Sequence, residues 1–398
     1  MNANNILYLS CDNLKKICNA SLIEGVNCYL DIFHNAILET VKEPIFLLID
    51  ESQIDVDWSI IGKIIFDTNK NIFMIFTGSS ALELTYNADS ARRLLKIPIM
   101  PLSYPEQLKL KYGKFNTEMF NSINELIYNG NIEKAKGLES QLLKIYSEFE
   151  NYNINEWENF LKFGGFPSNF NQKQHEIINK LIDTVNRVVT NDMKNINGLN
   201  GKTQDLAFNL LYFFALQNPG EVSKGSMANI FDSNKSTINK LLDTLEKTQL
   251  IFHVEPFTSS AKRTTKPNKY YFATSSLKHV LSLAIGNASL ENKQAYMGKL
   301  FENFVASTFF NFEKINNNIH KTYYDSGKKQ DKNVDFIIQK GFEKPIPIEV
   351  SYGRKDKSQI KNAIRRYKAN HGIIISNTTK IKKEDNVIYL PRELFSFL

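Results

Sequence analysis

The chain has 398 residues, 42% hydrophobic and 23% charged, with a formal net charge of +7. This length suits about two to four domains, and the composition is that of an ordinary globular protein. No apolar run approaches the ~20 residues of a membrane-spanning helix, so we expect no association with a membrane.

The cysteines Cys11, Cys18 and Cys28 all lie near the N-terminus. Their spacing matches no zinc motif, and an odd number argues against a disulfide framework. The first 20 residues do not have the pattern of a signal peptide. Together these features predict a cytoplasmic protein with reduced thiols.

Strands and helices alternate along the first 80 residues. Apolar runs predict strands at 5–12, 44–51 and 72–80, and helical periodicity predicts helices at 26–42 and 56–67. Strand, helix, strand with short connections is typical of right-handed βαβ units, so we expect a parallel sheet.

The strand at 44–51 ends in two carboxylates, Asp50 and Glu51. They would lie at the C-terminal edge of the sheet, where open α/β sheets bind ligands. In a P-loop ATPase this is the Walker B position, where Asp50 would hold Mg²⁺ and Glu51 would orient the attacking water. The alternative is a buried strand that runs into an acidic turn.

The strand at 72–80 ends in small polar residues. Thr77 and Ser79 are the candidates to contact a γ-phosphate or the attacking water, although Ser/Gly-rich loops commonly leave strands. Arg92 and Arg93 follow; they are either solvated charges or arginine fingers on the nucleotide of a neighbouring subunit. The second interpretation requires a homo-oligomer.

Residues 201–275 have the pattern of a winged helix-turn-helix. Three predicted helices are followed by two strands joined by a basic loop. Lys235 and Lys240 lie at the start of the would-be recognition helix. The loop, which would be the wing, has four basic residues and no acidic one: Lys262, Arg263, Lys266 and Lys269. We favour phosphate contacts over a scaffold role.

The C-terminal portion has a second set of acidic residues. Glu302 lies on a predicted helix, Asp335 opens a strand, and Glu349 interrupts the apolar strand 346–350. A buried carboxylate is costly unless it is paired or metal-bound. The pattern is that of PD-(D/E)xK nucleases, in which the two strand carboxylates hold Mg²⁺ and a lysine positions or activates water.

Ser351 stands where that motif has its lysine, and Arg354 or Lys355 would have to reach in from the next loop. The alternative is a degenerate nuclease core that binds metal or DNA weakly. The stretch 351–383 has ten Lys or Arg residues and one acid. Lys361 and Arg365 would share a helix face there, which favours a nucleic-acid phosphate surface over a solvated helix.

Four motifs follow one another in an order that resembles a known family. They are Leu-Leu-Ile-Asp-Glu (47–51), Phe-Thr-Gly-Ser-Ser-Ala (76–81), Pro-Leu-Ser-Tyr-Pro-Glu (101–106) and Phe-Gly-Gly-Phe-Pro (163–167). The order is similar to that of prokaryotic ATPases of the AAA superfamily, the archaeal-ATPase type. The resemblance implies a P-loop-type domain with a helical lid, a winged helix and a nuclease-like C-terminal domain, with ATP and Mg²⁺ as cofactors.

The fold class expected is therefore a multidomain α/β protein: a P-loop NTPase-like parallel sheet with a helical lid, a winged helix-turn-helix, and a restriction-endonuclease-like α/β domain. The predicted boundaries are 1–103 for the AAA core, 104–200 for the lid, 201–275 for the winged helix and 290–398 for the nuclease-like domain.

The sequence departs from the family in one large respect. No Gly-x-x-x-x-Gly-Lys-Ser/Thr occurs, and the nearest string, Gly201-Lys202-Thr203, has Ile196 where the first glycine belongs. The family's P-loop would precede the strand at 5–12, so it is either upstream of residue 1 or lost. Without this phosphate cradle, we expect the chain to hydrolyse ATP poorly or not at all.

Three functions remain open from the sequence. The first is an AAA-type ATP-binding protein associated with nucleic acid. The second is a metal-dependent DNA nuclease that uses Glu302, Asp335 and Glu349. The third is a non-catalytic DNA-binding or regulatory protein.

Overall fold

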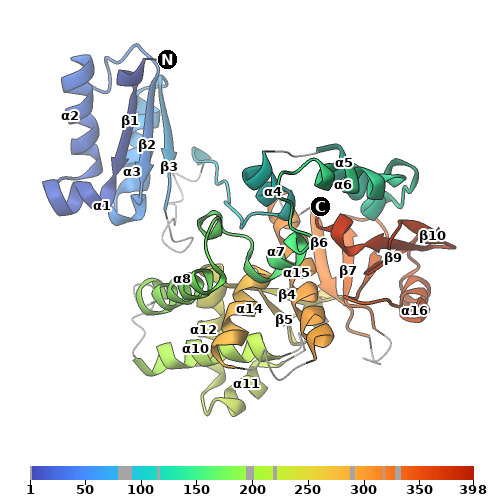
Figure 1. The fold of residues 1–398 in the computed structure, drawn as a ribbon. Coiled ribbons are helices and arrows are strands. Elements are labelled where there is room, and N and C mark those ends of the chain that lie inside the picture. The colour runs from blue at the N-terminus through green and yellow to red at the C-terminus, as the bar shows by residue number, and fades with distance from the viewer. Residues whose placement is uncertain are drawn as a thin grey trace. The chain divides into compact units, whose positions relative to one another are not determined.

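The structure of the protein, a computed structural model, describes residues 2–78, 92–113, 117–193, 201–217, 222–286, 292–316, 319–327 and 333–398. The chain forms two compact units, Met1–Ile97 and Pro98–Leu398 (Figure 1). No helix in the described ranges combines the length and apolarity needed to cross a membrane.

The first unit contains the predicted parallel sheet. Its strands lie in the order β1 (Ile6–Ser10), β2 (Ile45–Asp50) and β3 (Ile72–Phe76), and all pairs are parallel. The helices are α1 (Cys11–Asn13), α2 (Leu22–His34) and α3 (Trp58–Thr68). The three strand predictions are confirmed, each within a few residues.

The helix predicted at 26–42 is displaced towards the N-terminus. Ser21 and Glu24 form a capping box that starts α2 at Leu22, and Asn35 ends it with a left-handed φ of 45°. The apolar residues Leu38 and Val41 therefore lie outside the helix, although both are buried in the same core. Their helical spacing was coincidental.

One face of this sheet is covered and the other is not. Leu9, Leu47 and Ile49 are buried against residues of α2 and α3. On the opposite face, Tyr8 is 64% exposed and Phe73 is 56% exposed. A parallel sheet is normally covered on both faces. Within the described residues, this unit therefore presents an apolar sheet face.

The second unit begins with a run of helices. They are α4 (Tyr104–Tyr112), α5 (Thr117–Asn129), α6 (Leu138–Ser147), α7 (Glu156–Phe163) and α8 (Gln174–Arg187). Next come α10 (Gly201–Leu216), α11 (Lys224–Ile230), α12 (Lys235–Lys247), β4 (Ile251–Pro256), α13 (Ser260–Arg263), β5 (Lys269–Phe272) and α14 (Ser275–Ala284). The Gly201-Lys202-Thr203 string opens α10, as a P-loop opens a helix, but the last described segment before it, Val188–Asp192, is helical and not a strand.

The last part of the chain is an α/β core. Its elements are α15 (Lys293–Ile315), β6 (His320–Tyr324), β7 (Phe336–Lys340), β8 (Ile346–Val350), α16 (Ser358–Tyr367), β9 (Gly372–Ser376), β10 (Lys382–Glu384), β11 (Val387–Pro391) and α17 (Arg392–Phe395). Strands β6, β7 and β8 pair antiparallel, whereas β8 and β9 are parallel. The order is helix, three-stranded meander, helix, parallel strand.

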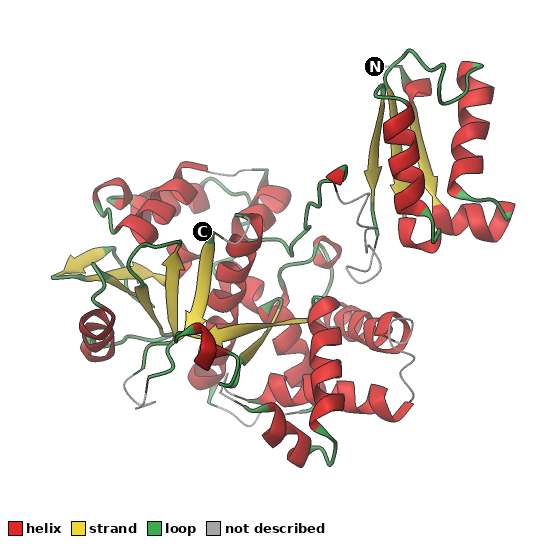
Figure 2. Cartoon of the chain, turned by 180° about the vertical axis from the view of Figure 1, so that it is seen from behind, coloured by secondary structure: helices red, strands yellow, loops and turns green. Residues whose placement is uncertain are grey.

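The hairpin of the helical region joins this core directly. The sheet has eight strands in the order β10-β11-β9-β8-β7-β6-β4-β5. Strand β4 pairs in parallel with β6 through Glu255–Tyr323 and Pro256–Tyr324. Residues predicted to form separate domains at 201–275 and 290–398 therefore share one sheet, which Figure 2 shows from behind.

The Phe-Gly-Gly-Phe-Pro motif joins three segments of this unit. Gly164 accepts a hydrogen bond from the buried Ser276 hydroxyl at 2.8 Å, and Gly165, with φ of 95°, accepts one from Leu102 at 2.9 Å. A Cβ atom at Gly164 would lie 2.2 Å from the Phe160 ring. The glycines are therefore required by close packing.

Candidate functional site

Two carboxylates face each other at the edge of the β7–β8 ladder. Phe336 pairs with Ile348, so the next antiparallel pair brings Asp335 opposite Glu349. The Val350 N–H donates a hydrogen bond of 2.7 Å to Asp335 Oδ2, which fixes that side chain. Glu349 is only 2% exposed. The strand pairing thus brings together two residues that the sequence separates by fourteen positions.

The third predicted carboxylate joins them from the helix α15. Burial and the charge of Asp335 raise the pKa of Glu302 to about 7. The same two causes raise the pKa of Glu349 to about 8, and Glu302 adds a smaller repulsion. Burial also raises the pKa of Asp335. Mutual perturbation of buried carboxyls is characteristic of functional sites, although structural networks also produce it.

Lys355 supplies the positive charge that Ser351 lacks. It comes from the loop after β8, and its Nζ lies 2.7 Å from Glu349 Oε1. Burial lowers the pKa of Lys355, but the hydrogen bond and charge of Glu349 outweigh this and raise it. The other oxygen, Glu349 Oε2, is buried and has no hydrogen-bond partner in the part of the chain that the structure describes.

A pocket of about 560 Å³ opens beside these residues. It is lined by the first turns of α15, including Lys299 and Glu302, and by the segment 350–353 after β8. Ser351 lies in its wall, at the position of the motif lysine. The pocket therefore gives a substrate access to the Glu302 side of the site.

The donor set fits a hard divalent cation in part. Carboxylate oxygens are the ligands that Mg²⁺ prefers, and it is commonly held by one or two of them together with water and substrate phosphate. Among the described residues, no three His, Cys, Asp or Glu side chains are placed so as to hold a metal ion by themselves. Asp335 and Glu349, with the orphaned Oε2 atom, fit the two-carboxylate type of site.

The raised pKa values predict a pH-dependent response to metal. Glu302 and Glu349 would titrate near 4.5 when unfolded but near 7 and 8 when folded. Between about pH 4.5 and pH 8, the folded protein therefore binds more protons than the unfolded protein. Its stability consequently falls as pH rises from about 5 to about 8. We expect Mn²⁺ to raise the melting temperature more at pH 8.5 than at pH 6, because it binds the ionised carboxylates. Melting curves with and without MnCl₂ check this, and an equal shift at both pH values would contradict it.

The predicted Walker B residues lie at the C-terminal end of β2 in the first unit. Asp50 accepts hydrogen bonds from Tyr8 Oη at 2.9 Å and from the Thr77 hydroxyl at the end of β3. The Thr77 and Tyr8 hydroxyls lower the pKa of Asp50. Thr77 thus meets Asp50 as the parallel sheet predicts. Glu51 has a left-handed φ of 52° and accepts a hydrogen bond from Gln53.

The other residues predicted for the ATP site are Ser79, Arg92 and Arg93. Ser79 lies outside the described residues. Arg92 is exposed, and Arg93 forms an ion pair of 2.7 Å with Asp67 on α3 of the same unit. Asp50 suits a magnesium ion, but the glycine-rich loop and lysine that would cradle nucleotide phosphates are not among the 398 residues. The residues present therefore do not make a complete ATP site.

Comparisons with known proteins match three separate segments of the chain. Residues 1–108 match the family model of an AAA domain. Residues 154–289 and 297–395 match two domains of unknown function, DUF8612 and DUF4143. The uncharacterized protein MJ1637 of Methanocaldococcus jannaschii is 32% identical over 395 residues, which cover 99% of this chain and 78% of that protein.

The chain belongs to the MJ1637 family. A second relative, an uncharacterized protein of Haemophilus influenzae, is 26% identical over 314 residues, or 76% of this chain and 64% of that protein. The AAA and DUF4143 matches agree with the archaeal-ATPase type of AAA protein that the motifs resemble. That part of the resemblance is confirmed, and it makes this member of the MJ1637 family an ATPase-like protein.

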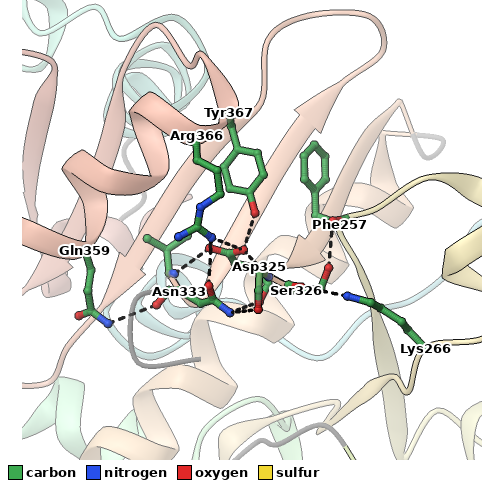
Figure 3. Close-up of polar contacts among 10 residues, drawn as sticks. Phe257, Lys266, Asp325, Ser326, Asn333, Gln359, Arg366 and Tyr367 are labelled. Carbon is green, nitrogen blue, oxygen red and sulfur yellow. Dashed lines mark hydrogen bonds and ion pairs between the residues drawn. The ribbon is translucent and has the colours of Figure 1, made fainter. Parts of the chain in front are cut away.

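The basic residues of the hairpin do not share one exposed surface. Lys262 is exposed, whereas Lys266 donates a hydrogen bond of 2.9 Å to the Ser326 carbonyl (Figure 3). Arg263 stacks over the Tyr323 ring at 4.6 Å and lies 3.6 Å from Glu255. Lys269 faces the Tyr324 ring at 5.3 Å. The sequence missed these internal contacts because it did not indicate that β4 pairs with β6.

The other basic candidates lie on the helices α12 and α16. Lys235 and Lys240 are exposed on the first two turns of α12, whose N-cap is Asn234. On α16, Arg365 is exposed and donates to the Asn362 side chain at 2.6 Å. Lys361 forms an ion pair of 2.8 Å with Asp385. Binding of phosphates by any of these residues stays a prediction.

Proposed function

We propose that this AAA-family protein hydrolyses phosphodiester bonds of DNA with a divalent cation, at a site formed by Asp335, Glu349, Glu302 and Lys355. One observation carries the proposal: a buried Glu349 with one oxygen paired to Lys355 and the other without a partner. An unsatisfied buried oxygen costs free energy, and this one lies on a carboxylate opposite a second carboxylate, Asp335. A bound cation would satisfy it.

The backbone arrangement supports the same proposal. Helix α15, the antiparallel strands β6 to β8, and the crossover through α16 to the parallel strand β9 carry the acidic residues, and this order of elements supports the PD-(D/E)xK resemblance. Ser351 lies where that resemblance expects lysine, and Lys355 reaches Glu349 from four residues further on. The site therefore has a lysine charge, although this lysine lies four residues beyond the position that the motif specifies.

Each residue has a definite task in this proposal. Asp335 and Glu349 would hold Mg²⁺ or Mn²⁺, which when bound offsets phosphate charge and lowers the pKa of a water molecule. Lys355, already 2.7 Å from Glu349, orients the attacking water or the phosphate oxygen beside it. Glu302 lines the pocket and is the third carboxylate of the site.

A second role is proposed for the first unit. Both oxygens of Asp50 are held by hydroxyl groups at the carboxyl edge of a parallel sheet, which is where such sheets bind ligands. Together with the AAA match, this supports a nucleotide-responsive unit that acts beside nucleic acid, in a homo-oligomer if Arg92 serves a neighbouring subunit. Because the phosphate cradle is missing from this sequence, we derive no ATP hydrolysis step.

The test of the nuclease proposal is cleavage of supercoiled plasmid and of labelled duplex oligonucleotides by the purified 398-residue protein. We expect nicking with Mg²⁺ or Mn²⁺ and none with EDTA. Asp335→Asn should remove it, whereas Asp385→Asn, a change of the same kind at a residue 73% exposed, should not. Absence of cleavage with every cation, or equal cleavage by Asp335→Asn, would overturn the proposal.

A further inference from the structure

Strand β5 presents two different faces to the rest of the unit. Tyr270 and Phe272 are buried among residues of α10, α12 and α14. Tyr271 points to the opposite face and is buried with residues of α15 and the strands β6 to β8. Lys269, two positions before Tyr271, shares its face because side chains alternate along a strand. The hairpin of the helical region thus contributes side chains to the carboxylate core.

The Tyr271 hydroxyl donates a hydrogen bond of 3.0 Å to Glu302 Oε1. Tyr271 is 1% exposed, and a buried phenol requires a polar partner. The next residue on each element locks the two together: the buried Asn303 side chain accepts from Phe272 N and donates to Phe272 O, both at 2.9 Å. This paired bond fixes the distance between β5 and α15 at the site.

We propose that Tyr271 is a positioning residue of the carboxylate site, one that holds Glu302 Oε1 so that the second oxygen serves the water bound to the cation that Asp335 and Glu349 would hold. The inference rests on the nuclease proposal and adds to it that the site is built from two segments that the sequence and the family models treat separately.

The test compares Mn²⁺ affinity, measured by calorimetry or electron paramagnetic resonance, in the wild type and in Tyr271→Phe. Partners that orient metal-binding groups typically contribute 10–100-fold to affinity, so we expect Tyr271→Phe to weaken Mn²⁺ binding by about 10-fold. The matched control is Tyr270→Phe, the same change at the neighbouring buried tyrosine on the opposite face, which should leave affinity unchanged.

A second variant separates positioning from a merely structural role. In a Glu302→Gln background, Tyr271→Phe should lower Mn²⁺ affinity no further, because the carboxylate that the Tyr271 hydroxyl holds has already been replaced. Melting curves for all variants show that the fold is retained. If the wild type binds no Mn²⁺, the nuclease proposal fails. If the wild type binds but Tyr271→Phe binds equally well, or weakens binding equally in both backgrounds, the positioning role alone is overturned.

Discussion

Lys355→Met is expected to lower cation-dependent DNA cleavage by about 10²–10⁴-fold, the usual contribution of a positioned proton-transfer or charge-stabilising group. The Lys355 ammonium group pairs with Glu349, and the Ser351 side chain has no charge that could replace it. Methionine keeps most of the length and apolar stem of the side chain. Initial rates on a labelled duplex at saturating Mn²⁺ measure the loss.

The same substitution should affect folding in a pH-dependent manner. Removing one partner of a buried ion pair typically costs about 3–5 kcal/mol, because the other charge stays buried and unpaired. The Lys355 side chain is 32% exposed, so we expect the lower end, about 3 kcal/mol. Burial raises the pKa of Glu349 to about 8, so at pH 6 this carboxyl is already protonated and the cost should be small. Urea unfolding of the metal-free protein at pH 6 and pH 9 measures both values.

Lys357→Met is the matched control for both effects. Lys357 lies two residues further along the same loop, is 43% exposed, and pairs with Glu384 at 2.9 Å. Exposed pairs of this kind contribute little to stability, because water and salt screen their charges. If Lys355→Met and Lys357→Met lower cleavage equally, the loss reflects loop charge in general, and the specific role of Lys355 is wrong.

The carboxylate pair could be found from the sequence because of its local pattern. Glu349 interrupts an otherwise apolar strand, and Asp335 immediately precedes another, so both were expected near a strand edge. The β7–β8 register that brings them opposite each other depends on the turn between the two strands, and it is known only from the structure. Lys355 could only be named as a candidate, because sequence spacing does not determine where a loop side chain points.

Tyr271 and the β4–β6 pairing gave no signal in the sequence. Strand β5 has only four residues, and β6 has mixed polar and aromatic residues with no clear alternation. A parallel pairing between strands separated by more than sixty residues is a non-local contact that no motif specifies. For that reason, a loop expected to be a free basic wing contains three residues with internal partners.

The polar network around Asp325 carries the largest effect that we expect on folding alone. Asp325 follows β6 and is 3% exposed. It accepts hydrogen bonds from Arg366 Nη1 at 3.1 and 3.0 Å, from the Tyr367 hydroxyl, and from the backbone N–H groups of Gly327 and Val334 (Figure 3). The carboxylate thereby connects α16 to the ends of β6 and β7.

Asp325→Ala should lower the free energy of unfolding by about 3–5 kcal/mol, because it removes the carboxylate partner of Arg366 and the acceptor of the Tyr367 hydroxyl and of the Gly327 and Val334 N–H groups. Asp325→Asn should cost less, since an amide oxygen still accepts from the backbone. Asp385→Ala, which breaks the exposed ion pair with Lys361 on the same helix, should cost much less than Asp325→Ala. Urea denaturation at neutral pH measures all three. Equal values for Asp325→Ala and Asp385→Ala would show that the network does not support the position of α16, whereas the expected order would show that Asp325 holds α16 to the ends of β6 and β7.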